Sequence, residues 1–394
     1  MSTALNLTNR QNFYIKLKLT KTLVNYKLGT ILRLFLKEKM AKKSGKSQKL
    51  RNYAKKTVEK PQISNVYLAR IKSSFKNFVI FSISLNFLLP LLIYAWPNVM
   101  NHMIFQHFLH LPFKNLSNPL EFNLNNTHAF VLNHDDIQLG AWHILPHDKQ
   151  LKPSSNLQEH FEINIEKSFE SKKSITILYL HGNTNDRSTY HRIQLYKYLS
   201  NLGYNVVAVD YRGYGDSTGE PTEIDVVRDA LFTYDFIKRT APWTTIYIWG
   251  HSLGTGITSS AARTLTEKNR APEGIILEAP FFNIVEEVEL HPFAWLFSYN
   301  KILFYMIENS LSKLNLQFRS DIHLQKVSSK IMILHAEDDI IIPFHQSEKL
   351  YDIVKNKGVS SNLTFHRIPS HHKCNHQNIY LYPDLTNLIS DFIN

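Results

Sequence analysis

The chain of 394 residues contains one cysteine, Cys374, so no disulfide can form within it, and cysteine usage indicates neither an oxidising nor a reducing compartment. Sequence patterns typical of metal sites are equally sparse. His371, His372, Cys374 and His376 lie close in sequence, but no second half-site with zinc-ligand spacing occurs elsewhere, so we expect no metal and no other cofactor. No repeats are visible. The length and the 43% hydrophobic content are compatible with one large α/β domain and extensions.

Acidic residues are scarce near the start of the chain. Residues 1–76 hold 19 Lys or Arg and only two acids, Glu38 and Glu59, which gives a net charge of +17. Because the whole chain is +12, the remaining residues carry −5. A nucleic-acid-binding protein would need this charge on a folded face with a readout motif, and the tail has none. We interpret residues 1–76 as a basic cytosolic tail, in which residues 13–37 either lie on an anionic leaflet or form a solvated arm.

Charge is absent from residues 78–96, which as an α-helix would be about 28 Å long, close to the thickness of a bilayer core. Lys72 and Lys76 precede this run, and Tyr94 and Trp96 end it. This pattern favours a transmembrane helix over residues 77–97 rather than a buried core helix. The basic bias places the N-terminus in the cytosol and the rest of the chain in the lumen or outside the cell. A transit peptide within residues 1–37 is a less economical explanation of the same charges.

A juxtamembrane segment, residues 98–128, follows the predicted span. Apolar residues recur at roughly helical spacing over residues 99–113, which indicates a helix that rests on the membrane surface or packs against the domain. Asn115, Asn125 and Asn362 each begin an Asn-X-Ser/Thr sequon, which is compatible with a glycoprotein facing the lumen.

Strand and helix patterns alternate through residues 129–394, which predicts an α/β fold with a mostly parallel sheet flanked by helices. A hairpin-like pair opens the domain at residues 129–132 and 137–145. Further strands are predicted at 175–180, 205–210, 246–249, 274–278, 330–335 and 362–368, and helices at 190–202, 224–239, 253–267, 344–354 and 382–393.

The stretch around Gly250-His251-Ser252-Leu253-Gly254 carries the chemistry. An apolar strand ends in a tight turn, and a helix with small residues follows. A nucleophilic serine needs this setting, because its hydroxyl must project from a strained corner that the two glycines keep free of side chains. The alternative is an ordinary glycine-bearing connection between a strand and a helix.

A serine hydroxyl is a poor nucleophile without a base and a group that orients the base. Asp339, just after the strand ending at His335, is our candidate acid, with Asp338 and Glu337 as alternatives. His371, His372 and His376 are candidate bases among which the pattern does not choose, whereas His366 lies within a predicted strand. The loop after residue 180 and the residue after the nucleophile predict Asn183 and Leu253 as oxyanion-hole donors.

Eight motifs between residue 175 and the end of the chain resemble the α/β-hydrolase superfamily and, within it, the membrane-anchored lysophosphatidylserine and monoacylglycerol lipases. They are Tyr179-Leu-His-Gly-Asn, Leu202-Gly-Tyr, Asp210-Tyr-Arg-Gly-Tyr-Gly-Asp-Ser, Tyr247-Ile-Trp-Gly-His-Ser-Leu-Gly-Thr-Gly, Leu277-Glu-Ala-Pro-Phe, His291-Pro-Phe, Leu334-His-Ala-Glu-Asp-Asp and the segment from His376 to Leu385. The resemblance implies a triad of Ser252, Asp339 and His376, with His372 as the next candidate base, because Lys373-Cys374-Asn375-His376 departs from the family's Gly-Tyr-Arg-His.

The segment 281–325 lies between two predicted core strands, where hydrolases carry a lid. It is rich in aromatic residues that suit an acyl chain or simply pack on the core: Phe293, Trp295, Phe297, Tyr299, Phe304 and Tyr305. The sequence therefore predicts a single-pass membrane serine hydrolase that acts on lysophospholipids or monoacylglycerols, and the resemblance implies the endoplasmic reticulum. A thioesterase that uses the same triad and a non-catalytic binding protein are the alternatives.

Overall fold

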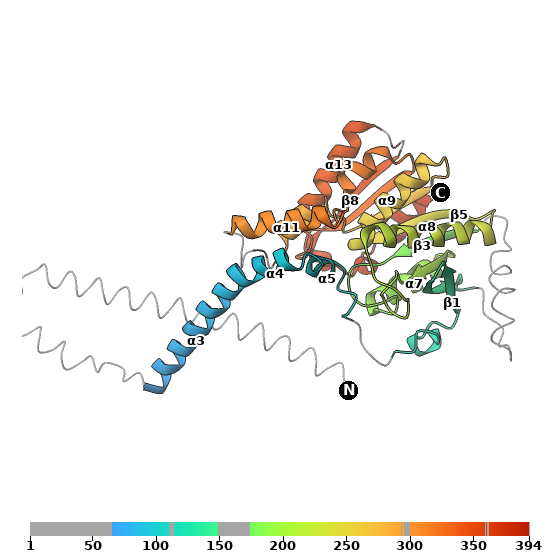
Figure 1. Cartoon of the computed structure of the whole chain (residues 1–394). Helices are drawn as coiled ribbons and strands as arrows, with labels where there is room; N and C mark the ends of the chain where they lie inside the picture. Colours follow the sequence, from blue (N-terminus) through green and yellow to red (C-terminus); the bar gives the residue numbers. More distant parts are fainter. Residues whose placement is uncertain are drawn as a thin grey trace, which may run out of the picture. The chain divides into compact units, whose positions relative to one another are not determined.

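The computed structural model describes residues 65–109, 114–148, 174–292, 294, 300–358, 360 and 362–393. The predictions for the tail up to residue 64, and for Phe293, Trp295, Phe297 and Tyr299 of the lid, fall outside these residues. The chain divides into two compact units, Met1–Asn77 and Phe78–Asn394. The described part of the first unit is the beginning of helix α3 (Asn65–Ile83), and the second unit contains all the other described elements (Figure 1).

Eight strands of the described residues form one sheet in the order β1-β2-β4-β3-β5-β6-β7-β8. Their bounds are β1 Thr127–His134, β2 Ile137–Ile144, β3 Ile175–Leu180, β4 Asn205–Val209, β5 Thr245–His251, β6 Gly274–Glu278, β7 Lys330–Ala336 and β8 Leu363–Ile368. β2 pairs antiparallel with both β1 and β4, and the remaining neighbours are parallel. The predicted hairpin followed by a mostly parallel sheet is thus confirmed.

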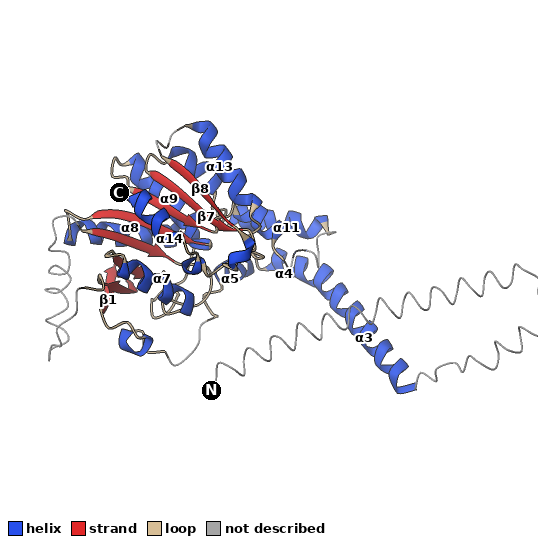
Figure 2. Cartoon of the chain, turned by 180° about the vertical axis from the view of Figure 1, so that it is seen from behind, coloured by secondary structure: helices blue, strands red, loops and turns tan. Residues whose placement is uncertain are grey.

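Helices cover both faces of the sheet (Figure 2). The longer ones are α7 Tyr190–Asn201, α8 Glu223–Thr240, α9 Leu253–Glu267, α11 Lys301–Lys313, α13 His345–Lys357 and α14 Leu385–Ile393. Short α-helices are α4 Leu89–Ala95, α5 Val99–Phe105, α10 Ile284–Leu290 and α12 Ser320–His323. Single turns are η1 Ser84–Leu88, which is π-helical, and the 3-10 turns η2 Pro119–Phe122, η4 Leu324–Lys326, η5 Ser370–His372 and η6 Ile379–Leu381.

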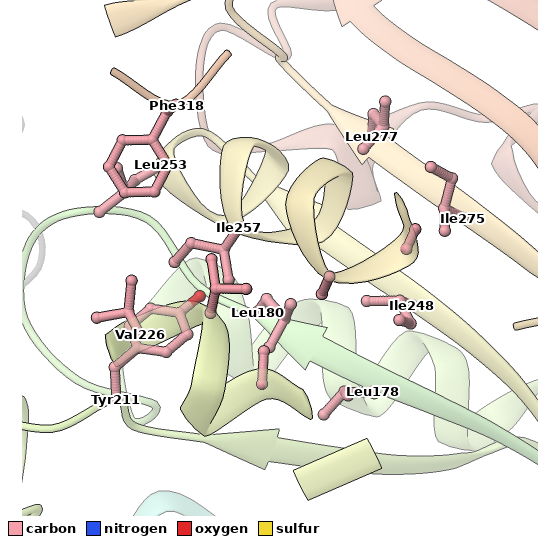
Figure 3. Close-up of a cluster of buried hydrophobic side chains, with 14 of the residues drawn as sticks. Leu178, Leu180, Tyr211, Val226, Ile248, Leu253, Ile257, Ile275, Leu277 and Phe318 are labelled. Carbon is pink, nitrogen blue, oxygen red and sulfur yellow. The ribbon is translucent and has the colours of Figure 1, made fainter. Parts of the chain in front are cut away.

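The central strands are buried on both faces, as parallel strands with helices on either side must be. On β3, Leu178 and Leu180 belong to the core beneath α8, α9 and α13, whereas Ile177 and Tyr179 belong to the core beneath α7 and α14. Figure 3 shows the first of these cores, in which Ile257 of α9 lies near Leu180 of β3 and Val226 of α8. This double burial explains why the strand bounds were predictable to within two residues.

The apolar segment before the domain continues into it. The helical stretch Lys72–Ala95 is long and apolar enough to cross a membrane. Its last turns do not stand apart from the hydrolase core, because Ile93 of α4 is fully buried in the same core as the sheet. Met100, Ile104 and Phe105 of α5 are buried there too. Core packing, one of the two settings expected for residues 99–113, therefore holds for these three residues, whereas Met103, Phe108 and Leu109 are exposed.

Candidate active site

Ser252 occupies the corner between β5 and α9. Its backbone has φ 54° and ψ −120°, a strained conformation for a residue with a side chain. The Ser252 N–H donates to the main-chain oxygen of Glu278 at 3.0 Å, and its carbonyl accepts from the N–H and hydroxyl of Thr255 at 2.8 and 2.7 Å. These bonds hold the corner in place, and the side chain is only 8% exposed.

The two glycines of the corner are sterically required. A Cβ at Gly254 would lie 2.0 Å from the main-chain oxygen of Leu180, and one at Gly250 would lie 2.4 Å from the main-chain oxygen of Gly254. Both distances are far below van der Waals contact. The sequence prediction that these glycines keep side chains out of the corner agrees with the observed packing, because the helix start lies directly against β3.

His376 reaches Ser252 from a loop near the other end of the chain. Its Nε2 lies 3.0 Å from the Ser252 Oγ, a hydrogen-bonding distance that suits proton transfer. Lys373 and Asn375, which precede it, both have left-handed backbone angles, with φ of 55° and 50°. The Asn375 N–H donates to the Asp338 carboxylate at 3.0 Å, which fixes the loop that carries the histidine.

Asp339 orients this histidine. Its Oδ2 accepts from Nδ1 of His376 at 2.7 Å, and its Oδ1 accepts from the N–H groups of Ile341 and Ile342 at 2.8 and 3.0 Å. Burial alone would raise the pKa of Asp339. The hydrogen bonds from His335 and His376 outweigh the burial and hold the pKa well below its usual value. The carboxylate therefore stays ionised and keeps the proton of His376 on Nδ1.

The alternative acids and bases lie elsewhere. Asp338 binds the main chain of Asn375, and Glu337 pairs with Arg367 at 2.5 Å. The ring of His372 packs against His371 and Tyr382. His366 is half-buried within β8. Of the candidates that the sequence left open, only Asp339 and His376 form a continuous hydrogen-bonded path to Ser252.

His335 was not foreseen as part of the site. It lies at the end of β7, fully buried, and its Nε2 is 3.1 Å from both Asp339 Oδ2 and the Ile342 carbonyl. Two acceptors at one nitrogen require a proton there, so His335 donates to the acid. Its Nδ1 is 2.5 Å from the Ser347 hydroxyl. The signal in the sequence was a histidine four residues before the acid, at the end of the same strand.

A second unforeseen histidine lies next to the nucleophile. Nε2 of His251 donates to the main-chain oxygen of His376 at 2.8 Å. Burial lowers the pKa of His251 well below its usual value, and the neighbouring rings of His376 and His191 add to this. The buried His191 ring packs against it, and burial lowers the pKa of His191 to about 3. The neutral His251 ring therefore connects the nucleophile strand to the loop of the base.

The predicted oxyanion donors flank the serine. Leu253 is the first residue of α9, so its N–H has no carbonyl one turn earlier in the helix. Asn183 follows β3, and a Cβ at the adjacent Gly182 would lie 3.3 Å from the Ser252 Cβ, which places this loop against the nucleophile. The Asn183 side chain donates to the Ile104 carbonyl at 3.1 Å. Its side-chain amide is thus engaged, and the main-chain N–H is the donor that the prediction requires.

Two further sequence predictions concern the lid and a possible metal site. In the predicted lid, 281–325, the described elements are α10, α11, α12 and η4, and Tyr305 is 68% exposed. Among the described residues, no three His, Cys, Asp or Glu side chains are grouped so that they could hold a metal ion.

Comparison with known proteins identifies a serine hydrolase. Residues 171–321 match a family model described as serine aminopeptidase, S33. The chain is 38% identical over 312 residues to the lysophosphatidylserine lipase ABHD12 of Danio rerio, covering 77% of this chain and 80% of that one. The Mus musculus protein of the same name is 37% identical, with 77% and 76% covered. Protein ABHD12B of Homo sapiens is 34% identical, with 64% and 69% covered.

Solved structures share the fold. An alpha-beta hydrolase from Vibrio vulnificus superposes with a TM-score of 0.55 at 16% identity, covering 74% of this chain and 92% of that one. The Pyrococcus furiosus esterase Pf2001 gives a TM-score of 0.51 at 16% identity, with 72% and 94% covered. At this identity the likeness concerns architecture alone, and it confirms the predicted α/β-hydrolase fold.

Proposed function

The chain belongs to the family of the lysophosphatidylserine lipases ABHD12, and on that basis we propose that it hydrolyses the acyl ester of lysophospholipids such as lysophosphatidylserine, and of monoacylglycerols, through Ser252, His376 and Asp339. The observation that carries the proposal is the unbroken path from the Ser252 Oγ through the His376 ring to the Asp339 carboxylate, with distances of 3.0 and 2.7 Å. All three roles of a serine-hydrolase triad are filled in one geometry.

In the proposed mechanism, Ser252 attacks the ester carbonyl while Nε2 of His376 takes the hydroxyl proton. Asp339 stabilises the imidazolium that forms. The main-chain N–H groups of Leu253 and Asn183 donate to the oxyanion of the tetrahedral intermediate, and each such donor is worth about 10² to 10³ in rate. His376 then protonates the departing alcohol, and a water molecule activated by the same histidine hydrolyses the acyl-enzyme.

The membrane anchor brings the enzyme to its substrate. We propose that the stretch Lys72–Ala95 crosses the membrane once, with the basic tail in the cytosol and the catalytic domain in the lumen of the endoplasmic reticulum or outside the cell. The charge asymmetry of the first 76 residues supports this orientation. Digestion of sealed microsomes by an added protease should spare the domain, and cleavage of the domain there would favour a thioesterase with cytosolic substrates.

The activity is tested by labelling the membrane fraction with a fluorophosphonate probe and by measuring fatty-acid release from lysophosphatidylserine and from a monoacylglycerol. Ser252→Ala and His376→Ala should each lower turnover by about 10⁴ to 10⁶. His372→Ala is the matched control, because its ring lies on the same loop without contacting Ser252. A folded wild-type chain that neither labels nor releases fatty acid would make a non-catalytic binding role the better explanation.

A further inference from the structure

The anchor helix contains a π-helical turn, η1 at Ser84–Leu88. Pro90, which has no N–H to donate to the preceding turn, comes two residues after it. Water is absent from the bilayer core, so polar groups at this turn are stabilised by hydrogen bonds to a neighbouring element.

The lid binds the anchor helix at this turn. Nδ2 of Asn300 lies 3.0 Å from the main-chain oxygen of Asn86 and 3.2 Å from its side-chain oxygen. Oδ1 of the same Asn300 accepts from the Leu303 N–H at 3.1 Å and so caps the start of α11. The Asn300 side chain therefore caps the lid helix and also binds the anchor helix, although Asn86 and Asn300 are 214 positions apart in the chain.

From this contact the two helices run side by side in the same direction. α11 packs along α4 and then α5, and the two helices lie together in both views (Figures 1 and 2). Leu303 and Ile307 of α11 are buried in the same core as Ile93 of α4. Residues 86–95 and 300–309 each advance about 14 Å, so Asn309 lies near the level at which α4 ends.

The exposed residues of α11 change from apolar to polar along the length of this helix pair. Near the Asn300 contact, Ile302 and Tyr305 of α11 are 67% and 68% exposed, and Leu88 and Leu91 of the anchor helix are each 60% exposed. The exposed residues further along α11 are polar: Glu308, Asn309, Ser312 and Lys313. Tyr94 and Trp96, residues typical of a membrane interface, are exposed where α4 ends. The exposed Lys301 has a long stem that can carry its charge toward the headgroups.

We propose that residues 301–306 of the lid are embedded in the hydrocarbon of the bilayer together with α4, and that Asn300 joins lid and anchor into one lipid-embedded element. The inference rests on the proposed function, because it assigns the bilayer interior as the phase from which acyl chains reach the lid. Lipid is the occupant that we favour, since α11 packs along α4 and both the anchor helix and the start of α11 expose large apolar side chains.

Depth-dependent quenching tests the embedding. Full-length Ile302→Cys, Tyr305→Cys, Leu91→Cys and Asn309→Cys variants are labelled with bimane and reconstituted in phosphatidylcholine vesicles, with or without dibrominated acyl chains. The native Cys374 is fully buried, so the unsubstituted chain is the labelling blank. We expect brominated lipid to quench bimane at 302 and 305 as strongly as at 91, and at least twofold more than at 309.

The remaining outcomes separate the alternatives. Quenching at 91 together with quenching at 302 and 305 only by aqueous iodide would place the lid in water and overturn the inference. Protection at 302 and 305 from both quenchers would mean that a second copy or another protein covers the face, which also overturns it. Absence of lipid quenching at 91 would refute the anchor itself. Fatty-acid release by the unlabelled chain reports separately on the proposed function.

Variants of Asn300 test whether its hydrogen bond to Asn86 joins the lid to the anchor helix. Asn300→Ser keeps an oxygen that can cap α11 but is too short to reach Asn86, whereas Asn300→Ala removes both contacts. We expect Asn300→Ser to lower hydrolysis of lysophosphatidylserine in vesicles by about tenfold, as loss of one desolvated hydrogen bond would, while hydrolysis of water-soluble p-nitrophenyl acetate stays within twofold. An equal loss on both substrates, or no loss on either, would contradict the role of Asn300 as a joint.

Discussion

Nε2 of His251 lies 2.8 Å from the main-chain oxygen of His376, so the residue before the proposed nucleophile holds the backbone of the proposed base in place. This bond closes a loop of contacts, because His376 in turn reaches the Ser252 hydroxyl at 3.0 Å. The distance between Ser252 and His376 is therefore fixed by two hydrogen bonds, one from the His251 ring to the His376 main chain and one between the His376 ring and the Ser252 hydroxyl.

Replacing His251 should slow the chemical step. His251→Phe keeps a ring of similar size and removes the donor, so we expect kcat to fall about 10- to 100-fold with KM within threefold. Because burial keeps the His251 ring neutral, the loss should be the same at pH 6 and pH 8. Rates of fatty-acid release and of fluorophosphonate labelling measure it. His191→Phe is the control, and an equal loss in that variant would show that ring packing, not the hydrogen bond, matters.

Asp339→Asn should lower kcat by about 10⁴, because the amide no longer holds the proton of His376 on Nδ1. The matched control is Asp338→Asn, which changes the neighbouring carboxylate that binds the Asn375 N–H. We expect that variant to keep at least a tenth of the wild-type kcat. Steady-state release of fatty acid from lysophosphatidylserine compares the two, and similar losses in both would argue against Asp339 as the orienting acid.

Gly254→Ala should disrupt the nucleophile corner, because its Cβ would lie 2.0 Å from the Leu180 carbonyl. We expect a loss of more than about 3 kcal/mol in the free energy of unfolding, together with loss of labelling. Gly203→Ala is the comparison, since no atom lies within 4 Å of the position that its added methyl group would take, and only its φ of 87° is unfavourable. That change should cost about 1 kcal/mol. Thermal unfolding in detergent, followed by tryptophan fluorescence, ranks the two.

Glu278 should make the protein less stable as the pH rises. Burial raises its pKa from 4.5 to about 8, while the Trp249 indole donates to it at 2.8 Å. Between these values the folded protein binds a proton that the unfolded chain has lost, so the free energy of unfolding falls with rising pH. Glu278→Gln removes this contribution and should flatten the dependence of Tm on pH between 5 and 8. Glu289→Gln, at an exposed site, should leave the slope unchanged, and an unchanged slope in both variants would count against a protonated Glu278.

The sheet was predictable from the sequence because its central strands are continuous apolar runs that are buried on both faces. The tight turn at Ser252 was also predictable, since any side chain at positions 250 and 254 would clash and the sequence has glycine at both. The course of the loop before His376 cannot be recognised from residue types in the same way. It depends on left-handed backbone angles at Lys373 and Asn375, and so the pattern alone could not choose among three histidines.

The supporting contacts were beyond sequence reasoning for another reason. His251 and His335 both lie inside recognised motifs, but their roles depend on the partners that folding brings to them. His251 binds a carbonyl 125 residues away, and Asn300 binds one 214 residues away. A periodic pattern reports which face of a strand or helix is buried, and it contains no information on which distant carbonyl will lie opposite a given donor.

The order of the triad along the chain has a consequence for biosynthesis. Ser252 precedes its base by 124 residues, and the hydroxyl of Tyr247, on the strand that leads to Ser252, donates to the main-chain oxygen of Ile393 in α14 at 3.0 Å. A nascent chain therefore contains the proposed nucleophile long before the proposed base has been synthesised. In the proposed mechanism the serine stays inert until His376 is in place, so hydrolysis can begin only after the last strand and α14 have joined the domain.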